Sequence, residues 1–436
     1  MASFKYGKTI RKQDIQSCGE YPVFSGYQVV GYLPGYMYKE EQLIIVCRGA
    51  GGTGDIKMSP SFCSITNLAI IISCDDKIID KGYLYWRLIL SDTYSLRTGS
   101  AQPQITINTL ESFEIDIEPN LRKQREIARI LFNINNKIRN NVDINQTLEQ
   151  MAQALFKSWF VDFEPVKAKI AVLEAGGSQE DATRAAMMAI SGKDADILAV
   201  FEREHPEQYA ELKATAELFP SAMQDSELGA IPEGWNIGKL GDIIEFNPKR
   251  VLKKGNIAPY LDMKNVPITG HSAQEIIDRE FSSGSKFRNG DTLLARITPC
   301  LENGKTAFVD FLLTDEMIGW GSTEFIIMRS KKSLPLSLSY FLARLDYFRT
   351  IAIQSMQGTS GRQRADASVL ERHIWVVPPN EILKKFGIFS DSVLNCNRAR
   401  NAENNALTEL RDTLLPKLLS GEITLPEAEQ IISEEA

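Results

Sequence analysis

The chain has few of the residues that build metal sites and disulfide frameworks. Its 436 residues include six cysteines and three histidines. The cysteines form no Cys-x-x-Cys pair, and His205, His271 and His373 lie far apart in the sequence. This spacing indicates neither a structural zinc site nor a disulfide framework, so we expect no metal in this chain.

Long apolar runs are also lacking. No stretch approaches the roughly 18 apolar residues that a membrane-spanning helix needs, and the opening residues MASFKYGKTIRK lack the apolar core of a secretory signal. With 43% hydrophobic and 24% charged residues, the composition is that of a globular chain of two to four domains. We therefore expect a cytoplasmic protein with no membrane contact.

Recognisable catalytic motifs are absent as well: there is no Walker A sequence, HExxH or (D/N)PP(Y/F). Gly49, Gly51 and Gly54 make a formal GxGxxG after an apolar strand, which leaves a dinucleotide-dependent enzyme as one alternative. However, Pro60 and β-forming residues follow where that fold needs a helix, and this favours a tight loop between strands. We expect neither a catalytic residue nor a cofactor in this chain.

The two carboxylates Asp116 and Glu118, ahead of Lys123, loosely resemble a nuclease site. They alternate with apolar residues along the segment SFEIDI, as the solvent-facing side chains of a β-strand do. A solvated strand face therefore explains them without catalysis.

The net charge of −7 is unevenly distributed. Acidic residues outnumber basic ones by seven between Pro165 and Trp235, and four glutamates follow in 427–436. The remainder carries a weak positive charge of about +4, which is compatible with DNA binding.

The segment Thr109 to Phe160 has a second, diverged copy from Val369 to Leu419. Leu110-Glu111 and Pro119-Asn120 recur as Leu370-Glu371 and Pro379-Asn380 at an offset of 260, and later pairs such as Leu155 and Leu414 at 259. A period this long indicates two copies of a whole module. Because subtracting 260 from Ile231 gives a negative number, we expect the first copy to be N-terminally short by roughly thirty residues.

Each copy predicts a strand, then a long amphipathic helix whose apolar residues step by three or four. Two such helices in one chain most simply pack together, antiparallel, as a spacer. The residues predicted to hold this spacer are Ile127, Ile134, Leu148, Leu155, Trp159, Phe386, Val393, Leu407 and Leu414. Short β segments with turn residues precede each helix. The predicted fold class is thus α+β, with two mostly β domains each followed by a long helix.

Two polar loops occupy corresponding places before the repeat, RTGSAQPQIT at 97–106 and QGTSGRQRADAS at 357–368. Small residues allow close backbone approach, and arginine and glutamine side chains reach phosphates and base edges. A solvated surface loop is the alternative interpretation. Arg296 and Lys305 lie in a turn that resembles the place of Arg48 and the glycine loop in the first half. The candidate nucleic-acid contacts are Arg48, Ser100, Gln102, Gln104, Arg296, Lys305, Thr359, Ser360, Arg362 and Arg364.

The chain resembles the specificity subunit of type I restriction-modification systems. The resemblance covers nearly the whole chain and is carried by GSAQPQITINTLESFEIDIEP with QREIARIL, by LEQMAQALFKSWFVDFEPV, and by LFPSAMQDSELGAIPEGWNIGKLGDI. It implies a non-catalytic reader of a bipartite DNA sequence, in which each target-recognition domain reads one half-site of double-stranded DNA and the paired helices set their spacing.

The same resemblance implies the partners: two modification (methyltransferase) subunits, which would carry S-adenosylmethionine, and restriction subunits that translocate and cut DNA. It divides the chain into a first target-recognition domain at 1–108, a strand and helix at 109–164, an acidic helical linker at 165–231, a second target-recognition domain at 232–368, a second strand and helix at 369–420, and an acidic tail at 421–436. The runner-up is a coiled-coil scaffold with two protein-binding heads and no DNA role.

Overall fold

The structure is a computed structural model that describes residues 2–49, 52–99, 102–359 and 362–435. The chain divides into two compact units, of which unit 1 comprises Met1–Asn140 with Glu403–Ala436, and unit 2 comprises Asn141–Ala402. Two long helices, α3 (Leu121–Phe160) and α12 (Asn380–Ser420), each contribute residues to both units. The α+β class predicted from the sequence is confirmed.

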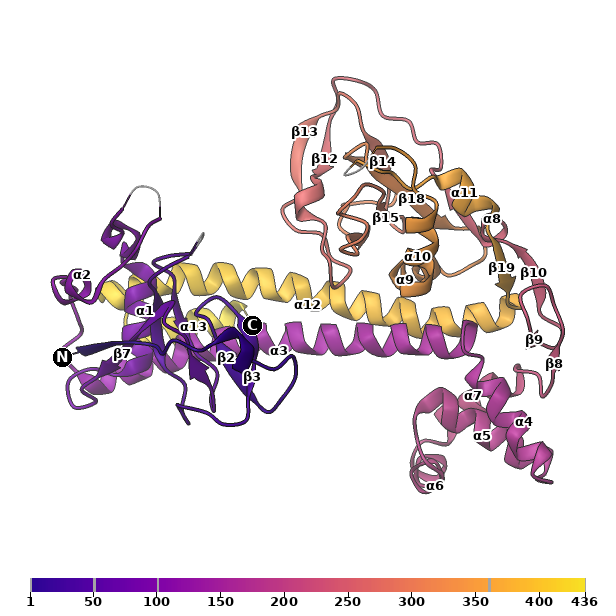
Figure 1. Cartoon of the computed structure of the whole chain (residues 1–436), viewed down its shortest axis with the longest axis horizontal. Coiled ribbons are helices and arrows are strands. Elements are labelled where there is room, and N and C mark those ends of the chain that lie inside the picture. The colour runs from indigo at the N-terminus through magenta and orange to yellow at the C-terminus, as the bar shows by residue number, and fades with distance from the viewer. Residues whose placement is uncertain (1, 50–51, 100–101, 360–361, 436) are drawn as a thin grey trace. The chain divides into compact units, whose positions relative to one another are not determined.

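Unit 1 is built on a four-stranded antiparallel sheet in the order β1-β7-β4-β5. Figure 1 labels β7 of this sheet and helix α1. The runs LIIV in β4 and AIII in β7 are buried on both faces, as central strands require. One face packs on α1, α3 and α12, and the other on a second sheet, β3-β2-β6. The strands are β1 (Ala2–Tyr6), β2 (Tyr21–Phe24), β3 (Val29–Leu33), β4 (Leu43–Val46), β5 (Ile56–Met58), β6 (Ser64–Ile65) and β7 (Ala69–Cys74), and the shorter helices are η1 (Lys12–Asp14), α1 (Lys81–Leu90), η2 (Thr93–Leu96) and α2 (Ile107–Glu111).

Unit 2 repeats this topology. Its sheet β11-β18-β15-β16 is antiparallel like the first, and its sheet β13-β12-β17-β14 contains one parallel pair, β12 with β17, as β2 pairs with β6 in unit 1. The strands are β11 (Ile244–Phe246), β12 (Ile257–Leu261), β13 (Ile277–Glu280), β14 (Ser285–Phe287), β15 (Thr292–Ala295), β16 (Thr306–Phe308), β17 (Gly319–Gly321) and β18 (Phe325–Ser330). The internal repeat therefore extends to the β domains.

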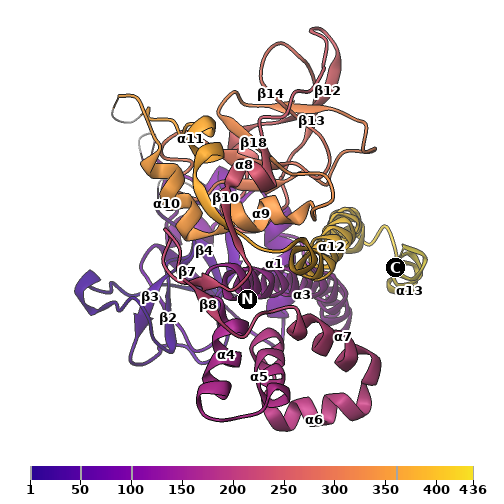
Figure 2. The same cartoon turned by 90° about the vertical axis from the view of Figure 1, so that its right-hand side faces the viewer.

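Unit 2 also holds elements without a described counterpart in unit 1. The predicted acidic linker forms a small helical bundle with its own apolar core (Figure 2), consisting of α4 (Glu164–Glu174), α5 (Gln179–Ser191), α6 (Ala195–Glu204) and α7 (Pro206–Glu217). The remaining elements of this unit are β8 (Met223–Gln224), β9 (Ile231–Pro232), β10 (Asn236–Lys239), α8 (Leu240–Ile243), η3 (Met263–Asn265), α9 (Ser337–Arg344), α10 (Asp346–Gln354), α11 (Ala367–Arg372) and β19 (Ile374–Val377).

The two long helices pair antiparallel within each unit, as predicted. In unit 1, Asn135 of α3 accepts a hydrogen bond from Arg411 of α12. In unit 2, the ring centroids of Phe156 and Phe386 lie 5.3 Å apart. Residue numbers therefore rise along α3 as they fall along α12. None of the described helices is long and apolar enough to cross a membrane.

One expectation differs from the structure. The segment SFEIDI is not a β-strand, because no strand lies beside it among the described residues. The predicted acidic tail contains helix α13 (Leu425–Glu435), which packs on the core of unit 1 through the fully buried Ala428.

A buried charge cluster ties the β domain of unit 2 to α3. The imidazole of His271 is 2% exposed, with Nδ1 3.6 Å from a carboxylate oxygen of Glu149 on α3 and Nε2 3.1 Å from one of Asp310. The hydroxyl of Tyr340 on α9 also donates to Glu149. Burial lowers the pKa of His271, but the hydrogen bonds and charges of Asp310 and Glu149 outweigh this effect and raise the pKa from 6.5 to about 9.

This raised pKa predicts a pH-dependent stability. The protonated imidazole stabilises the folded state fully below about pH 6.5, and the contribution is lost as the pH rises through about 9. We expect the free energy of unfolding to fall by up to about 3 kcal/mol across this window. Tyr340 stays neutral there, because burial raises its pKa well above the ordinary value.

Urea denaturation at a series of pH values checks the prediction, with His271→Gln as the matched variant. We expect the variant to be less stable at pH 6.5 and to show a flatter pH dependence. Parallel curves for the two proteins between pH 6.5 and 9 would contradict this role for His271.

Candidate functional site

The first polar loop forms a short hairpin beside the end of β4. Thr98 and Gln104 exchange backbone hydrogen bonds of 2.8 and 2.9 Å, and the N–H of Ile105 donates to the carbonyl of Cys47 at 3.0 Å. Gln102 and Gln104 are exposed, whereas Ile105 is buried. The hairpin therefore presents two amide side chains to solvent from a firmly anchored base.

The second polar loop has the same construction beside the end of β15. Gln357 and Arg364 exchange backbone hydrogen bonds of 3.0 and 2.9 Å, and the N–H of Ala365 donates to the carbonyl of Arg296 at 2.8 Å. Arg362 and Arg364 are exposed, and Ala365 is buried. Two guanidinium groups thus stand where the first hairpin has two amides.

The two hairpins match position by position. At an offset of 260, each residue of 102–110 has the same degree of burial as its counterpart in 362–370. Two of the predicted residues, Ser100 and Ser360, lie outside the described residues. Thr359 is exposed, and its carbonyl accepts from the N–H of Arg362 at 3.0 Å.

Each hairpin contacts the loop that follows the central strand of its sheet, which is β4 in unit 1 and β15 in unit 2. In unit 1, Arg97 donates to the carbonyl of Thr53, and the guanidinium of Arg97 lies 4.2 Å from the ring centroid of Tyr94. In unit 2, the N–H of Thr298 donates to the carbonyl of Gln363 at 3.1 Å. These contacts hold the hairpins against the sheets, and Thr53, Tyr94 and Arg97 were not among the predicted residues.

The predicted cationic side chains differ in whether they form an ion pair within the chain. Arg48 and Arg362 are exposed and form no ion pair among the described residues, although the guanidinium of Arg48 lies 5.6 Å from the ring centroid of Tyr6. Arg364 chelates the carboxylate of Glu324, which raises the pKa of the guanidinium. Glu324 was not predicted, because nothing in its local sequence indicates a contact with a residue 40 positions away.

Two further predicted cations are turned toward the protein. The ammonium of Lys305 donates to the carbonyls of Met263 and Lys264 at 2.8 and 3.3 Å. Arg296 is half-buried, and its Nε has no hydrogen-bond partner among the described residues.

The expected equivalence of Arg296 with Arg48 is off by one residue. The backbone bonds to the hairpins align Arg296 with Cys47, and the isolated bridges align Ile297 with Arg48. Side chains alternate direction along extended chain, so a shift of one position turns the arginine to the opposite side.

The glycine loop after β4 does not form a dinucleotide site. β4 leads into the antiparallel strand β5 rather than a helix, and Gly49, Gly52 and Gly54 adopt positive φ angles in the turn. The dinucleotide-dependent enzyme is therefore ruled out as an alternative, since that fold places a helix N-terminus at the pyrophosphate. Within the described ranges, no group of three or more His, Cys, Asp or Glu side chains could hold a metal ion.

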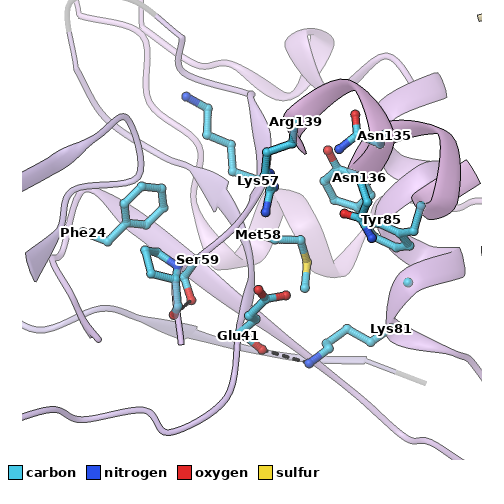
Figure 3. A pocket seen from close by; sticks show the side chains of 13 residues that line it. Phe24, Glu41, Lys57, Met58, Ser59, Lys81, Tyr85, Asn135, Asn136 and Arg139 are labelled. Atoms are coloured by element: carbon cyan, nitrogen blue, oxygen red, sulfur yellow. Dashed lines mark hydrogen bonds between the residues drawn. The ribbon is translucent and has the colours of Figure 1, made fainter. Parts of the chain in front are cut away.

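A cavity of about 770 Å³ lies in unit 1 between the β domain and α3 (Figure 3). Its lining includes Lys57, Lys81 and Arg139 together with Glu41. The ammonium of Lys81 donates to the backbone carbonyl of Glu41 at 2.8 Å, as the dashed line in Figure 3 shows. The ammonium of Lys57 lies 3.9 Å from the carboxylate of Asp55. The lining is basic, with no paired nucleophile and base among the labelled side chains.

The predicted helix stripe is mostly buried inside the chain. Six of its nine residues are at most 5% exposed, namely Ile127, Ile134, Trp159, Phe386, Val393 and Leu414. Their side chains hold the helices and β domains together and cannot contact another chain. Leu148, Leu155 and Leu407 are half-buried.

A partly exposed apolar stripe lies on α3 in unit 2, with Leu148 and Leu155 half-buried against the core and Ile144 and Met151 exposed. It consists of Ile144, Leu148, Met151 and Leu155, spaced by four, three and four residues, so that they share one helix face. Ile144 is 42% exposed and Met151 is 53% exposed. Leu148 and Leu155 of this stripe were among the predicted spacer residues, whereas Ile144 was not.

Known proteins share this arrangement. Residues 1–150 match the family model described as the type I restriction modification DNA specificity domain. The chain is 30% identical over 386 residues to the specificity subunit of the type I restriction enzyme HindI of Haemophilus influenzae, covering 81% of this chain and 80% of that protein. It is 24% identical over 360 residues to the MjaIX specificity subunit of Methanocaldococcus jannaschii, covering 79% and 69%.

The fold agrees with these sequence matches. A crystal structure of a type I restriction-modification S subunit from M. genitalium aligns with a TM-score of 0.55 at 14% identity, covering 96% of this chain and 93% of that one. The extent and identity of the Haemophilus match establish the family. The chain is therefore a member of the specificity subunits of type I restriction-modification systems.

Proposed function

We propose that the chain reads a bipartite sequence in double-stranded DNA, with each β domain reading one half-site. The observation that carries this proposal is the pair of polar hairpins at equivalent places in the two units. Amide and guanidinium side chains donate to purine edges in the major groove and to phosphates. The equivalent placement of polar loops in two diverged copies supports a shared binding role over an unrelated solvated loop in each.

The long helices would set the spacing between the half-sites. At about 1.5 Å per residue, a helix of 40 residues is roughly 60 Å long, somewhat under two turns of duplex at about 34–36 Å each. A rigid helix pair tolerates only a narrow range of half-site separations. The spacer would thus contribute to specificity without touching a base.

Two modification subunits and the restriction subunits are the proposed protein partners. The modification subunits would bind S-adenosylmethionine and methylate adenine, and the restriction subunits would translocate and cut DNA. This chain would determine which DNA sequence is bound and would not catalyse a reaction. The partly exposed stripe of Ile144, Leu148, Met151 and Leu155 is the proposed docking surface for a modification subunit, because exposed apolar stripes of this kind are covered in assemblies.

A coiled-coil scaffold with two protein-binding heads is the competing function. It shares the helix pair and the docking stripe but requires no DNA contact from the hairpins. Sequence-selective binding to DNA therefore separates the two functions.

The first test measures DNA binding by the chain co-purified with its modification subunit. Methylation mapping of the host genome defines the target, and fluorescence anisotropy then measures affinity for target and random duplexes across salt concentrations. We expect Arg362→Ala to weaken target binding by about 1–3 kcal/mol, since its guanidinium is free to reach DNA. We expect a smaller loss for Arg364→Ala, because Glu324 already holds that guanidinium.

Arg203→Ala is the matched control, since it removes an equally positive, exposed side chain from the helical bundle. Its target affinity should match the wild type. Absence of sequence-selective, salt-sensitive binding by the wild type would refute DNA reading. Wild-type affinity of Arg362→Ala would remove that hairpin from the interface.

The second test concerns docking. Met151→Asp puts an unpaired charge on the exposed stripe, and we expect it to weaken association with the modification subunit by about 2 kcal/mol or more. Size-exclusion chromatography of the co-expressed subunits measures the loss. Gln146→Asp, at an exposed position on another face of the same helix, should leave the complex intact. An unaltered complex for Met151→Asp would show that the stripe is not the docking surface.

A further inference from the structure

The cavity of unit 1 between the β domain and α3 is a feature that DNA reading leaves unexplained. Its volume of about 770 Å³ lies in the range of about 300–1,000 Å³ that small-molecule sites occupy. It lies near the start of β4, where Glu41 precedes the strand and Met58 of β5 pairs with Leu43. The hairpin proposed to read DNA is bonded to Cys47, just after the other end of the same strand. The cavity and the hairpin are therefore separate places in the unit.

A smaller cavity of about 360 Å³ lies at the equivalent place in unit 2. Four residues of α3 line the first cavity, and their counterparts on α12 at an offset of 259 line the second. Strands β10 and α8 of unit 2, which have no described counterpart in unit 1, are not among the residues that line the second cavity. The hollow therefore results from the way each β domain packs on its long helix. The four pairs are Phe132 and Asp391, Asn135 and Leu394, Asn136 and Asn395, and Arg139 and Arg398.

The two cavities differ in charge. Three arginines and three aspartates line the second cavity, so its charges balance. The first cavity is lined by Lys57, Lys81 and Arg139 against Glu41 alone, which leaves a surplus of two positive charges. A cavity lined by charge of one sign concentrates ligands of the opposite sign. The cavity of unit 1 thus favours an anionic ligand, whereas its counterpart in unit 2 does not.

The cations of the first cavity are only weakly compensated within the chain. The ammonium of Lys81 donates to a backbone carbonyl, that of Glu41, which carries no net charge. Among the described residues, Arg139 forms no ion pair or hydrogen bond, and its side chain is exposed. Lys57 lies 3.9 Å from a carboxylate oxygen of Asp55, a long distance for an ion pair. Two of the three cations are therefore free to bind an anion.

Aromatic rings form part of the cavity wall. The rings of Tyr85 and Phe132 stack, with centroids 5.5 Å apart and planes inclined by 25°. In Figure 3 the ring of Phe24 lies on the other side of the cavity from Tyr85. Burial raises the pKa of Tyr85, and the positive charges of Arg411 and Arg139 oppose this shift, so cations lie close to the rings. Planar bases stack on such rings, and phosphate groups bind such cations.

We propose that the cavity of unit 1 binds a nucleotide with two or more phosphate groups. Lys81 and Arg139 donate charged hydrogen bonds to phosphate oxygens, and Lys57 adds a third positive charge. The base packs on the ring pair of Tyr85 and Phe132. The site goes beyond DNA reading and does not rest on it, because it lies at the other end of β4 from the hairpin.

The test titrates ATP and pyrophosphate, without a divalent cation, into the full chain co-purified with its modification subunit. Saturating S-adenosylmethionine is present, so that the site proposed in the modification subunit is already filled. Isothermal titration calorimetry measures both dissociation constants, with each probe taken up to about 1 mM. We expect ATP to bind about tenfold more tightly than pyrophosphate, because only ATP carries a base that can stack.

A matched pair of variants locates the site. Arg139→Ala removes an exposed side chain without disturbing the core, and we expect it to weaken ATP binding about tenfold or more, as loss of a charged hydrogen bond does. Arg398→Ala removes the equivalent exposed arginine of unit 2 and should leave the affinity for ATP unchanged.

No binding of ATP, equal affinity for ATP and pyrophosphate, or equal weakening by the two variants would each overturn the proposal. A saturating target duplex should leave ATP bound, and displacement of ATP by the duplex would assign the cavity to the DNA backbone instead. Failure of the chain to select a DNA sequence would count against DNA reading alone, so the two proposals fail independently.

Discussion

The burial of apolar faces between α3 and α12 is the constraint on which the rest of the structure depends. In unit 2 the ring of Phe386 packs against Phe156 and Phe160 at centroid distances of 5.3 and 5.5 Å. Nearby, Asn145 and Asn397 each donate a side-chain amide to the other's backbone carbonyl, at 3.4 and 3.2 Å. These two donated bonds form in one register only, and a slip of one residue would break both, although the side-chain oxygen of each asparagine has no partner among the described residues. The helices therefore pair in a defined alignment.

Within unit 2, the β domain is attached to α3 at a defined position. The cluster of His271, Glu149 and Asp310 fixes the second domain to α3 through charges as well as apolar contacts. The second polar hairpin is bonded to the end of β15 through Ala365 and Arg296. The N–H of Phe308 in β16 donates to the carbonyl of His271, and β16 pairs with β15. The ion pair with Glu149 and these hydrogen bonds thus connect α3 to the loop proposed to read DNA, and rigid positioning of this kind is what a selective binding site requires.

Much of this arrangement could be predicted from the sequence, because the repeat and the apolar periodicity report directly on chain topology. Other features depend on contacts that no local pattern encodes. The stripe that includes Ile134 and Phe386 was predicted to be apolar and to pack, but periodicity does not say whether the covering surface belongs to the same chain. The sequence predicts that Arg364 is free to donate to DNA, because Glu324, which accepts hydrogen bonds from its guanidinium, lies 40 residues away in the sequence. The segment SFEIDI has the alternation of a strand, yet a strand needs a neighbour, and alternation says nothing about one.

The unpaired segment SFEIDI of unit 1 does not disturb the hairpin that precedes it. That hairpin is fastened to β4 by the bond from Ile105 to Cys47, and helix α2 after it is anchored by the buried Leu110. Neither contact passes through Glu114–Ile117. The same two anchors recur in unit 2 as Ala365 to Arg296 and as Leu370, where the following strand is paired. Since the loops have equal burial in both units, contacts with the central sheet are enough to position them, and the unpaired segment does not alter the hairpin of unit 1.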